Sequence, residues 1–248
     1  MKTTKVLYLL PLLALNSCVL SKNISPSPDG RTVKVAVVKP ADIDILPMDV
    51  IYRSEKCRDK IFTSTGAITS RAGYHLLTVP FNPEKSSDIV SNNIALNGGG
   101  QCEWKLSNIR FQFKFSDMTK FGTDIKNNIS NDIVFVFDKN SPSRGDGHYE
   151  NISGDIVIKQ DYYPLIRSDR MIDHTKTLRL INKDMLTYRV SDSESLLFEP
   201  NVHSDKIVNV LGPEKFGENS ITTYPDGTQT TNAKGPEPLN FEKLKLMK

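Results

Sequence analysis

The chain has 248 residues, of which 38% are hydrophobic and 25% are charged, so it contains enough apolar side chains for a packed core. A mean hydropathy of −0.35 excludes a polytopic membrane protein. Because 32 basic residues stand against 29 acidic ones, the charge does not indicate nucleic-acid binding, and we expect no nucleic-acid partner.

The N-terminal segment is typical of a secretory signal. Lys2 and Lys5 precede a short apolar stretch, Val6–Leu15, with about half of the roughly 20 residues that a membrane-spanning helix needs. The sequence LNSC at positions 15–18 resembles the lipobox of bacterial lipoproteins. This resemblance implies a signal peptide at residues 1–17 and an acylated Cys18. The alternative is an ordinary signal peptide with an unmodified thiol at Cys18.

The residues after Cys18 predict where and how the protein is anchored. Val19 rather than Asp follows the cysteine, which in lipoproteins of this kind implies the outer membrane, with the folded part facing the periplasm. The segment at residues 18–30 is rich in Ser and Pro, and we expect it to be the lipidated cysteine and a flexible tether. A domain at residues 31–231 and a C-terminal tail at residues 232–248 follow.

Cys57 and Cys102 are the two cysteines that remain if Cys18 is lipidated. The compartment outside the inner membrane is oxidising, which favours a disulfide between them. Two free buried thiols or a metal site are the alternatives. Neither cysteine has a second Cys or a His close by, as a zinc site with local ligand spacing would need.

Short apolar runs, bounded by Gly, Pro, Asn or Asp, recur through the domain and predict strands. The fold class that we expect is therefore mainly β: a sandwich-like domain or two packed antiparallel sheets, with one or two short helices, braced by one disulfide. An alternative divides the domain into two subdomains near residues 140–153. The predicted strands are Val33–Val38, His75–Phe81, Trp104–Phe115, Ile133–Phe137, Asp155–Lys159, Thr177–Ile181, Leu186–Val190, Ser195–Phe198, Ile207–Leu211 and Ser220–Tyr224.

Local signals add two helices and one turn. Asn82 as N-cap and Pro83 at the first helical position predict a short helix that continues to Ser91. Phe241–Met247 predicts a terminal turn of helix. Tyr224–Thr228 contains Asp-Gly and predicts a hairpin turn, because such turns require a positive φ.

The strand from Cys102 to Phe115 changes its apolar phase along its length. Trp104 and Leu106 alternate in one phase, whereas Ile109, Phe111 and the following aromatic residues alternate in the other. Because a strand has period two, one extra residue near Ser107-Asn108, a β-bulge, would return both halves to the same core face.

The sequence GGGQCEWKLSNIRFQF at residues 98–113 is similar to a segment of small lipoproteins of Gram-negative bacteria. Some of these resemble immunity proteins for type VI secretion effectors, which bind incoming toxins in the periplasm. The resemblance implies that the protein binds another protein and catalyses no reaction. It transfers no site residue, because the shared segment is a Cys/Trp core strand.

No catalytic motif of the common hydrolases, metalloproteases or nucleotide-binding proteins occurs in the sequence, and we expect neither an enzyme nor a cofactor. The Asp138–Ser153 loop contains several oxygen and nitrogen donors. A metal-assisted hydrolase centred on Asp146 and His148 is therefore one alternative, and a solvated loop is the other. Asp173-His174 could orient a base, but no nucleophile can be assigned to it.

Tyr162, Tyr163, Arg167 and Arg170 combine residue types that dominate protein interfaces, and we predict a partner-binding role for them. In the alternative, the two tyrosines help to cover the core. Pro164 favours an edge strand or a loop for this stretch. The function that follows is stoichiometric binding of a protein partner, with a secreted effector toxin as the leading candidate. An envelope structural or assembly lipoprotein is the second possibility.

Overall fold

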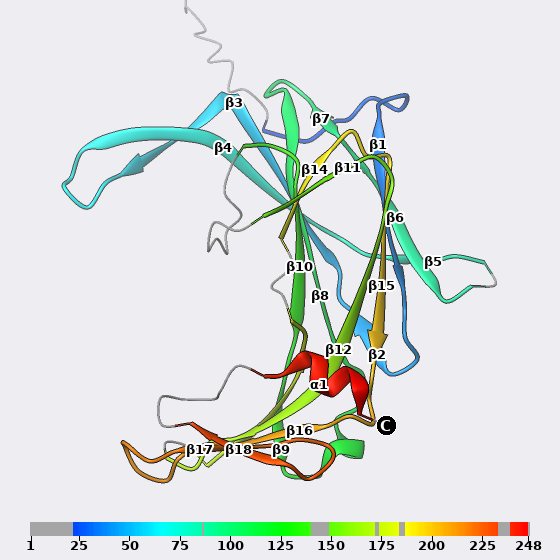
Figure 1. Cartoon of the computed structure of the whole chain (residues 1–248). Coiled ribbons are helices and arrows are strands. Elements are labelled where there is room, and N and C mark those ends of the chain that lie inside the picture. The colour runs from blue at the N-terminus through cyan, green and yellow to red at the C-terminus, as the bar shows by residue number, and fades with distance from the viewer. Residues whose placement is uncertain are drawn as a thin grey trace, which may run out of the picture.

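The protein consists of two packed β-sheets and one short helix (Figure 1). This computed structural model describes residues 22–85, 87–139, 149–171, 174–183, 187–232 and 239–247. The predicted signal peptide and the predicted lipidation site, Cys18, lie outside the described residues. The mainly β, two-sheet class expected from the sequence is confirmed.

The first sheet has eight strands, in the order β11-β14-β10-β8-β3-β4, and β2 and β7 also pair with β8. Its strands are β2 (Ile43–Ile45), β3 (Met48–Phe62), β4 (Ile68–Val79), β7 (Asn97–Gly99), β8 (Trp104–Phe115), β10 (Asn131–Val136), β11 (Glu150–Ser153) and β14 (Thr187–Ser191). A 3-10 turn, η1 (Thr119–Phe121), follows β8.

The second sheet has ten strands, in the order β18-β17-β16-β12-β15-β1-β6-β5, with β13 paired to β12 and β9 to β13. Its strands are β1 (Thr32–Val38), β5 (Asn82–Pro83), β6 (Ile89–Ala95), β9 (Ile125–Ile129), β12 (Ile156–Ser168), β13 (Lys176–Ile181), β15 (Ser195–Val202), β16 (Val208–Leu211), β17 (Ser220–Thr223) and β18 (Gln229–Asn232). Helix α1 (Phe241–Leu246) is the terminal helix expected from the sequence.

The expected antiparallel pairing is only partly correct, because both sheets are mixed. β12 pairs in parallel with β15 and with β16, and β10 pairs in parallel with β14. The chain leaves β12 through β13 and crosses to β14 in the other sheet before it returns as β15. A strand that returns after such a crossover can run in the same direction as its neighbour, whereas a tight hairpin forces the opposite direction.

The main core lies between the two sheets, and β8 contributes more of its buried aromatic side chains than any other described strand. Trp104, Phe111, Phe113 and Phe115 are all buried in this cluster, which contains residues from both sides of positions 140–153. A smaller cluster lies beneath α1, where Leu244 is fully buried. The C-terminal segment therefore packs on the domain through this helix.

The predicted bulge in β8 is confirmed. Ile51 of β3 pairs with Asn108, and the next residue, Tyr52, pairs with Leu106, so Ser107 is the extra residue. The shift returns the apolar side chains of both halves of β8 to the core face, where Leu106 and Ile109 are both buried.

The predicted helix from Asn82 to Ser91 is wrong. Asn82 and Pro83 form β5, which pairs with Val90 and Ser91 of β6. β6 then pairs with β1 along seven residues and buries Ile94. A capping signal is a weak local preference, and pairing with a central strand outweighs it.

Pro164 also differs from expectation, because it lies within β12, which has partners on both sides. On one side β12 pairs with β15 up to Tyr162 and with β16 from Leu165, so Pro164 falls between two ladders. A proline lacks the backbone N–H that a ladder needs. The interval between two neighbouring strands therefore tolerates it.

The described part of the predicted tether lies against the domain. Ser25 donates its backbone N–H to Gly98 O at 2.8 Å and forms a bridge with Gly99. The Trp104 indole donates to Lys22 O at 3.1 Å. Residues 22–30 thus follow the end of the sheets near β7 and β8.

Candidate functional site

The most distinctive surface feature is the β3–β4 hairpin, which extends away from the two sheets (Figure 1). β3 pairs with β8 only through Asp49–Arg53, whereas its pairing with β4 continues to Phe62. We call residues 55–72 the projecting hairpin. Among the described strands, its two arms pair only with each other.

A wide bulge redirects the chain at the base of the projecting hairpin. Ser54 pairs with Gly73, and the next pair is Asp59 with Arg71, so the β3 arm carries three more residues than the β4 arm between these pairs. Gly73 fits here because it has no side chain: a Cβ atom would lie 1.9 Å from Cys57 O. Bulges bend a strand, which explains why the hairpin leaves the plane of the sheet.

The Cys57–Cys102 disulfide fixes this bulge to the sheet. The two Cα atoms are 5.3 Å apart, and both cysteines are buried beside Trp104. The Ser54 hydroxyl donates to Cys102 O and accepts a hydrogen bond of 2.9 Å from Cys57 N. The base of the hairpin is therefore held covalently and by buried hydrogen bonds, and the predicted disulfide is confirmed.

The tip of the hairpin exposes two large apolar side chains. Phe62 and Ile68 are paired across the strands, and they are 76% and 65% exposed. Paired residues of two antiparallel strands point to the same side, so the two side chains form one apolar patch. Tyr74 and Leu76 on β4 are also exposed. Scattered single apolar residues are normal on a surface, whereas large contiguous exposed apolar patches mark interaction sites.

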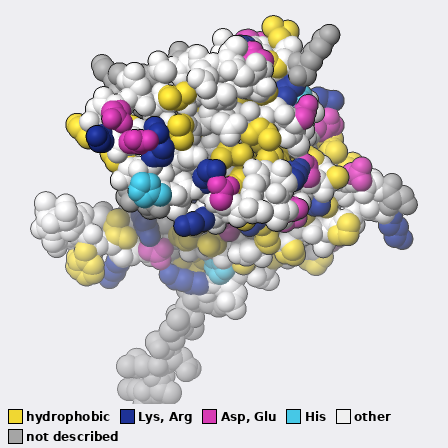
Figure 2. Space-filling view, turned by 90° about the horizontal axis from the view of Figure 1, so that it is seen from below, with side chains coloured by type: hydrophobic (Ala, Val, Ile, Leu, Met, Phe, Trp, Pro, Cys, Tyr) yellow, Lys and Arg dark blue, Asp and Glu magenta, His cyan; other side chains and the backbone are white. Residues whose placement is uncertain are grey.

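Basic side chains outnumber acidic ones along the projecting hairpin. The ionisable residues between positions 55 and 71 are Glu55, Lys56, Arg58, Asp59, Lys60 and Arg71. Lys56 pairs with Glu103 at 2.7 Å, and Asp59 pairs with Lys22 at 2.9 Å. Lys60 forms no ion pair within the described residues. By contrast, the face seen from below carries interspersed basic and acidic side chains (Figure 2).

The residues predicted from the sequence to bind a partner do not form one surface. Tyr162 lies in the main core, and Tyr163 is buried against the His203 ring, which stacks on it at 4.8 Å. Both tyrosines therefore have the role given by the alternative, which is to cover the core. Arg167 is exposed. Arg170 is engaged within the chain, since it donates to Gly212 O at 2.7 Å and pairs with Glu214 at 2.6 Å.

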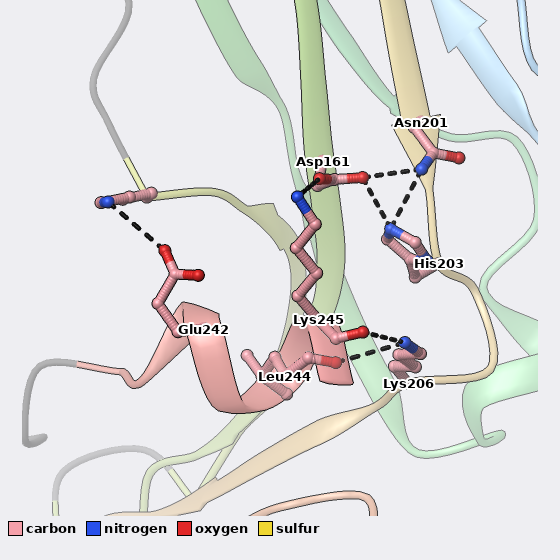
Figure 3. Close-up of polar contacts among 8 residues, drawn as sticks. Asp161, Asn201, His203, Lys206, Glu242, Leu244 and Lys245 are labelled. Atoms are coloured by element: carbon pink, nitrogen blue, oxygen red, sulfur yellow. Dashed lines mark hydrogen bonds and ion pairs between the residues drawn. The ribbon is translucent and has the colours of Figure 1, made fainter. Parts of the chain in front are cut away.

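One polar cluster that the sequence did not reveal joins β12, β15 and α1 (Figure 3). The His203 Nε2 atom lies 2.8 Å from Asp161 Oδ1, and Asn201 donates to the same oxygen at 2.6 Å. Burial would raise the pKa of Asp161, but the hydrogen bonds from His203 and Asn201 outweigh it and lower the pKa, with a further contribution from Lys245. The register that pairs Asp161 with Asn201 brings these distant residues together.

The geometry of this cluster supports a structural role. A catalytic Asp–His pair needs a nucleophile beside the imidazole. Within the described residues, no hydroxyl or thiol bonds to His203, and the adjacent Ser204 donates to Asp42 instead. Lys206, which is buried, donates to Leu244 O and Lys245 O at 3.2 Å each and so holds the end of α1 (Figure 3).

The alternative metal site cannot be located in this structure, because Asp146 and His148 lie outside the described residues, as does Asp173. In the described ranges, no three His, Cys, Asp or Glu side chains are grouped as metal ligands would be. His75, by contrast, packs edge-on against Trp104 at 5.4 Å.

Comparisons with known proteins identified no relative of this chain. Over the part of the chain that is described, no helix is long and apolar enough to span a bilayer. No protein-family model matches the chain, and neither the curated proteins nor the solved structures contain a match to it.

Proposed function

We propose that this protein acts by binding another protein and that the projecting hairpin is the element that binds. The observation that carries the proposal is the exposed pair Phe62 and Ile68 at the tip of a hairpin whose base is fixed by a disulfide. Fully burying one such side chain contributes about 1.5–3 kcal/mol. A rigid base adds to this, because less conformational entropy is lost on binding.

The charge of the hairpin defines the kind of partner. Lys60 lies two residues before Phe62 on β3, so its side chain points to the same side of the strand. A partner with an apolar pocket bordered by acidic side chains would complement this arrangement. The active-site cleft of an enzyme is a surface of this kind, and insertion of the hairpin would block such a cleft sterically.

The leading candidate for the partner is a secreted toxin, and the proposed location is the periplasmic side of the outer membrane, with Cys18 as the lipid anchor. The sequence supports this location through its signal segment and the LNSC motif. The Cys57–Cys102 disulfide is compatible with an oxidising compartment. Binding by occlusion needs no catalytic group from this chain.

Site-specific photo-crosslinking in the native host tests the proposal. A photoreactive phenylalanine analogue replaces Phe62 or Ile68 in the full chain, and the adduct is identified by mass spectrometry. Phe216 is the matched control position, because it is an aromatic residue with 98% exposure in the loop between β16 and β17, away from the hairpin. We expect one partner to crosslink at positions 62 and 68 and not at position 216.

The double variant Phe62→Ser/Ile68→Ser provides the quantitative test. Its affinity for the crosslinked partner should fall at least about tenfold, since two apolar contacts are lost, while its thermal stability stays unchanged because both side chains are exposed. If the partner is a toxin, cells that express the double variant should lose protection in a killing assay. An adduct that forms equally at position 216, or full affinity of the double variant, would refute the proposal.

A further inference from the structure

A cavity of about 1000 Å³ lies where the N-terminal segment crosses the end of the two sheets. Its walls are residues from Ser25 to Arg31, the β6–β7 turn and the start of β8, and the end of β14 with the loop that follows it. We call it the N-terminal cavity. Its volume is at the upper end of the roughly 300–1,000 Å³ that is usual for small-molecule sites.

Backbone hydrogen bonds hold these walls in place. Leu96 N donates to Arg31 O at 2.9 Å, Leu106 N donates to Leu96 O at 3.0 Å, and Ser25 N donates to Gly98 O at 2.8 Å. On the opposite wall the buried Ser193 hydroxyl donates to Gly154 O at 2.5 Å. The cavity is therefore preformed by strand pairing and does not depend on flexible side chains.

The floor of the cavity is apolar. Leu106 and Val190 are buried members of the main core cluster, and the partly buried Leu96 and Phe137 pack against it. An apolar floor favours a ligand that has a hydrocarbon or aromatic body, because burial of that body removes apolar surface from water.

Among the described residues that line the cavity, the charged side chains are two cations and one carboxylate. Arg31 and Lys105 are exposed, and neither forms an ion pair within the described residues. Asp192 is the single carboxylate among the described lining residues. Two cations without ion-pair partners beside an apolar floor favour an anionic group at the rim, since charge-assisted hydrogen bonds to Arg and Lys are stronger than neutral ones.

We infer that the N-terminal cavity binds a small amphipathic anion, with its apolar body on Leu96, Leu106 and Phe137 and its carboxylate, phosphate or sulfate group between Arg31 and Lys105. The site is distinct from the hairpin tip at Phe62 and Ile68. This inference does not rest on the proposed function.

Calorimetric titration of the full chain in phosphatidylcholine nanodiscs tests the inference, with empty nanodiscs titrated in parallel. Octanoate is the probe, octylammonium has the same chain with the opposite charge, and acetate has the same charge without the chain. We expect one octanoate per chain, with octylammonium and acetate each binding at least tenfold more weakly. The variant Arg31→Ala/Lys105→Ala should weaken octanoate binding at least tenfold.

Lys126→Ala/Arg167→Ala is the matched control, because it removes the same charge from β9 and the end of β12, outside the cavity. Its octanoate affinity should stay within twofold of the unchanged protein. Thermal unfolding of both double variants checks that the fold is retained. Equal binding of octanoate and octylammonium, an unchanged affinity of the cavity variant, or no saturable binding of octanoate would each overturn the inference.

Discussion

The disulfide at the base of the projecting hairpin should contribute a large share of the stability of the domain. Cys57 and Cys102 are 45 residues apart in the sequence. In the chain-entropy model, a crosslink that closes a loop of this length stabilises the folded state by about 4 kcal/mol. Domains of ordinary size are stable by only about 5–15 kcal/mol, so the double variant Cys57→Ala/Cys102→Ala should unfold at much lower denaturant concentration.

Urea unfolding followed by tryptophan fluorescence measures this effect directly. Trp104 is the single tryptophan of the chain, and it is fully buried two residues from Cys102. Its emission therefore reports the region that the disulfide holds. The reduced form of the unchanged protein provides the matched control, because it loses the crosslink and keeps both sulfur atoms.

The two measurements distinguish the stability contributed by the covalent crosslink from the stability contributed by packing of the sulfur atoms. We expect the reduced protein and the double variant to lose similar free energy of unfolding, about 4 kcal/mol, and hydrogen exchange to accelerate first at the base of the hairpin. A loss below about 1 kcal/mol in both would contradict the loop-closure argument. A loss in the double variant alone would mean that the packing of the sulfur atoms, rather than the covalent bond, stabilises this region.

Three further perturbations test other parts of the structure. Gly73→Ala should destabilise the fold by about 1–3 kcal/mol in the same urea assay, because its Cβ would lie 1.9 Å from Cys57 O; unchanged stability would contradict the bulge geometry. The pKa of Asp161 is lowered in the folded state, so its contribution to stability is present above the usual value of 3.8 and is lost as pH falls below it. Asp161→Asn should therefore reduce stability at pH 7 and flatten the pH dependence of the free energy of unfolding below pH 3.8. An equal slope of stability against pH in the variant and the unchanged protein would contradict the lowered pKa of Asp161. Lys206→Met should accelerate hydrogen exchange in α1 about tenfold or more, since two charge-assisted hydrogen bonds to Leu244 O and Lys245 O are lost, and unchanged exchange would show that the helix is held by apolar packing alone.

The strands that the sequence predicted are those with clear alternation of apolar residues. The prediction for β8 matched its observed bounds, and the phase change at Ser107-Asn108 located the bulge, because a bulge is a local event that side-chain period alone can reveal. β3 was missed, since its second half, from Ser54 onward, is polar and alternates no apolar residues. Beyond Cys57, that half is the exposed arm of the projecting hairpin, which lies away from the core that would impose the pattern.

The candidate sites could not be predicted from the sequence either. Tyr162 and Tyr163 are of a residue type that is common in protein interfaces, yet both are buried. Residue type alone does not specify which face of a strand meets the core. Asp161 and His203 are 42 residues apart and meet only through the parallel register of β12 and β15. The N-terminal cavity likewise combines four separate segments.

Sequence reasoning alone yields the β class, the bulge in β8 and the Tyr224–Thr228 turn, because each follows from local period or backbone preference. The Cys57–Cys102 pairing was favoured over free thiols or a metal site only through the compartment that the signal segment implies. The three-dimensional fold was needed to show that the sheets are mixed, that Pro164 lies within a paired strand, and that Phe62 and Ile68 project into solvent. Those features depend on which distant strands become neighbours. The free energy of that choice comes from burial and pairing across the whole chain, which no short segment encodes.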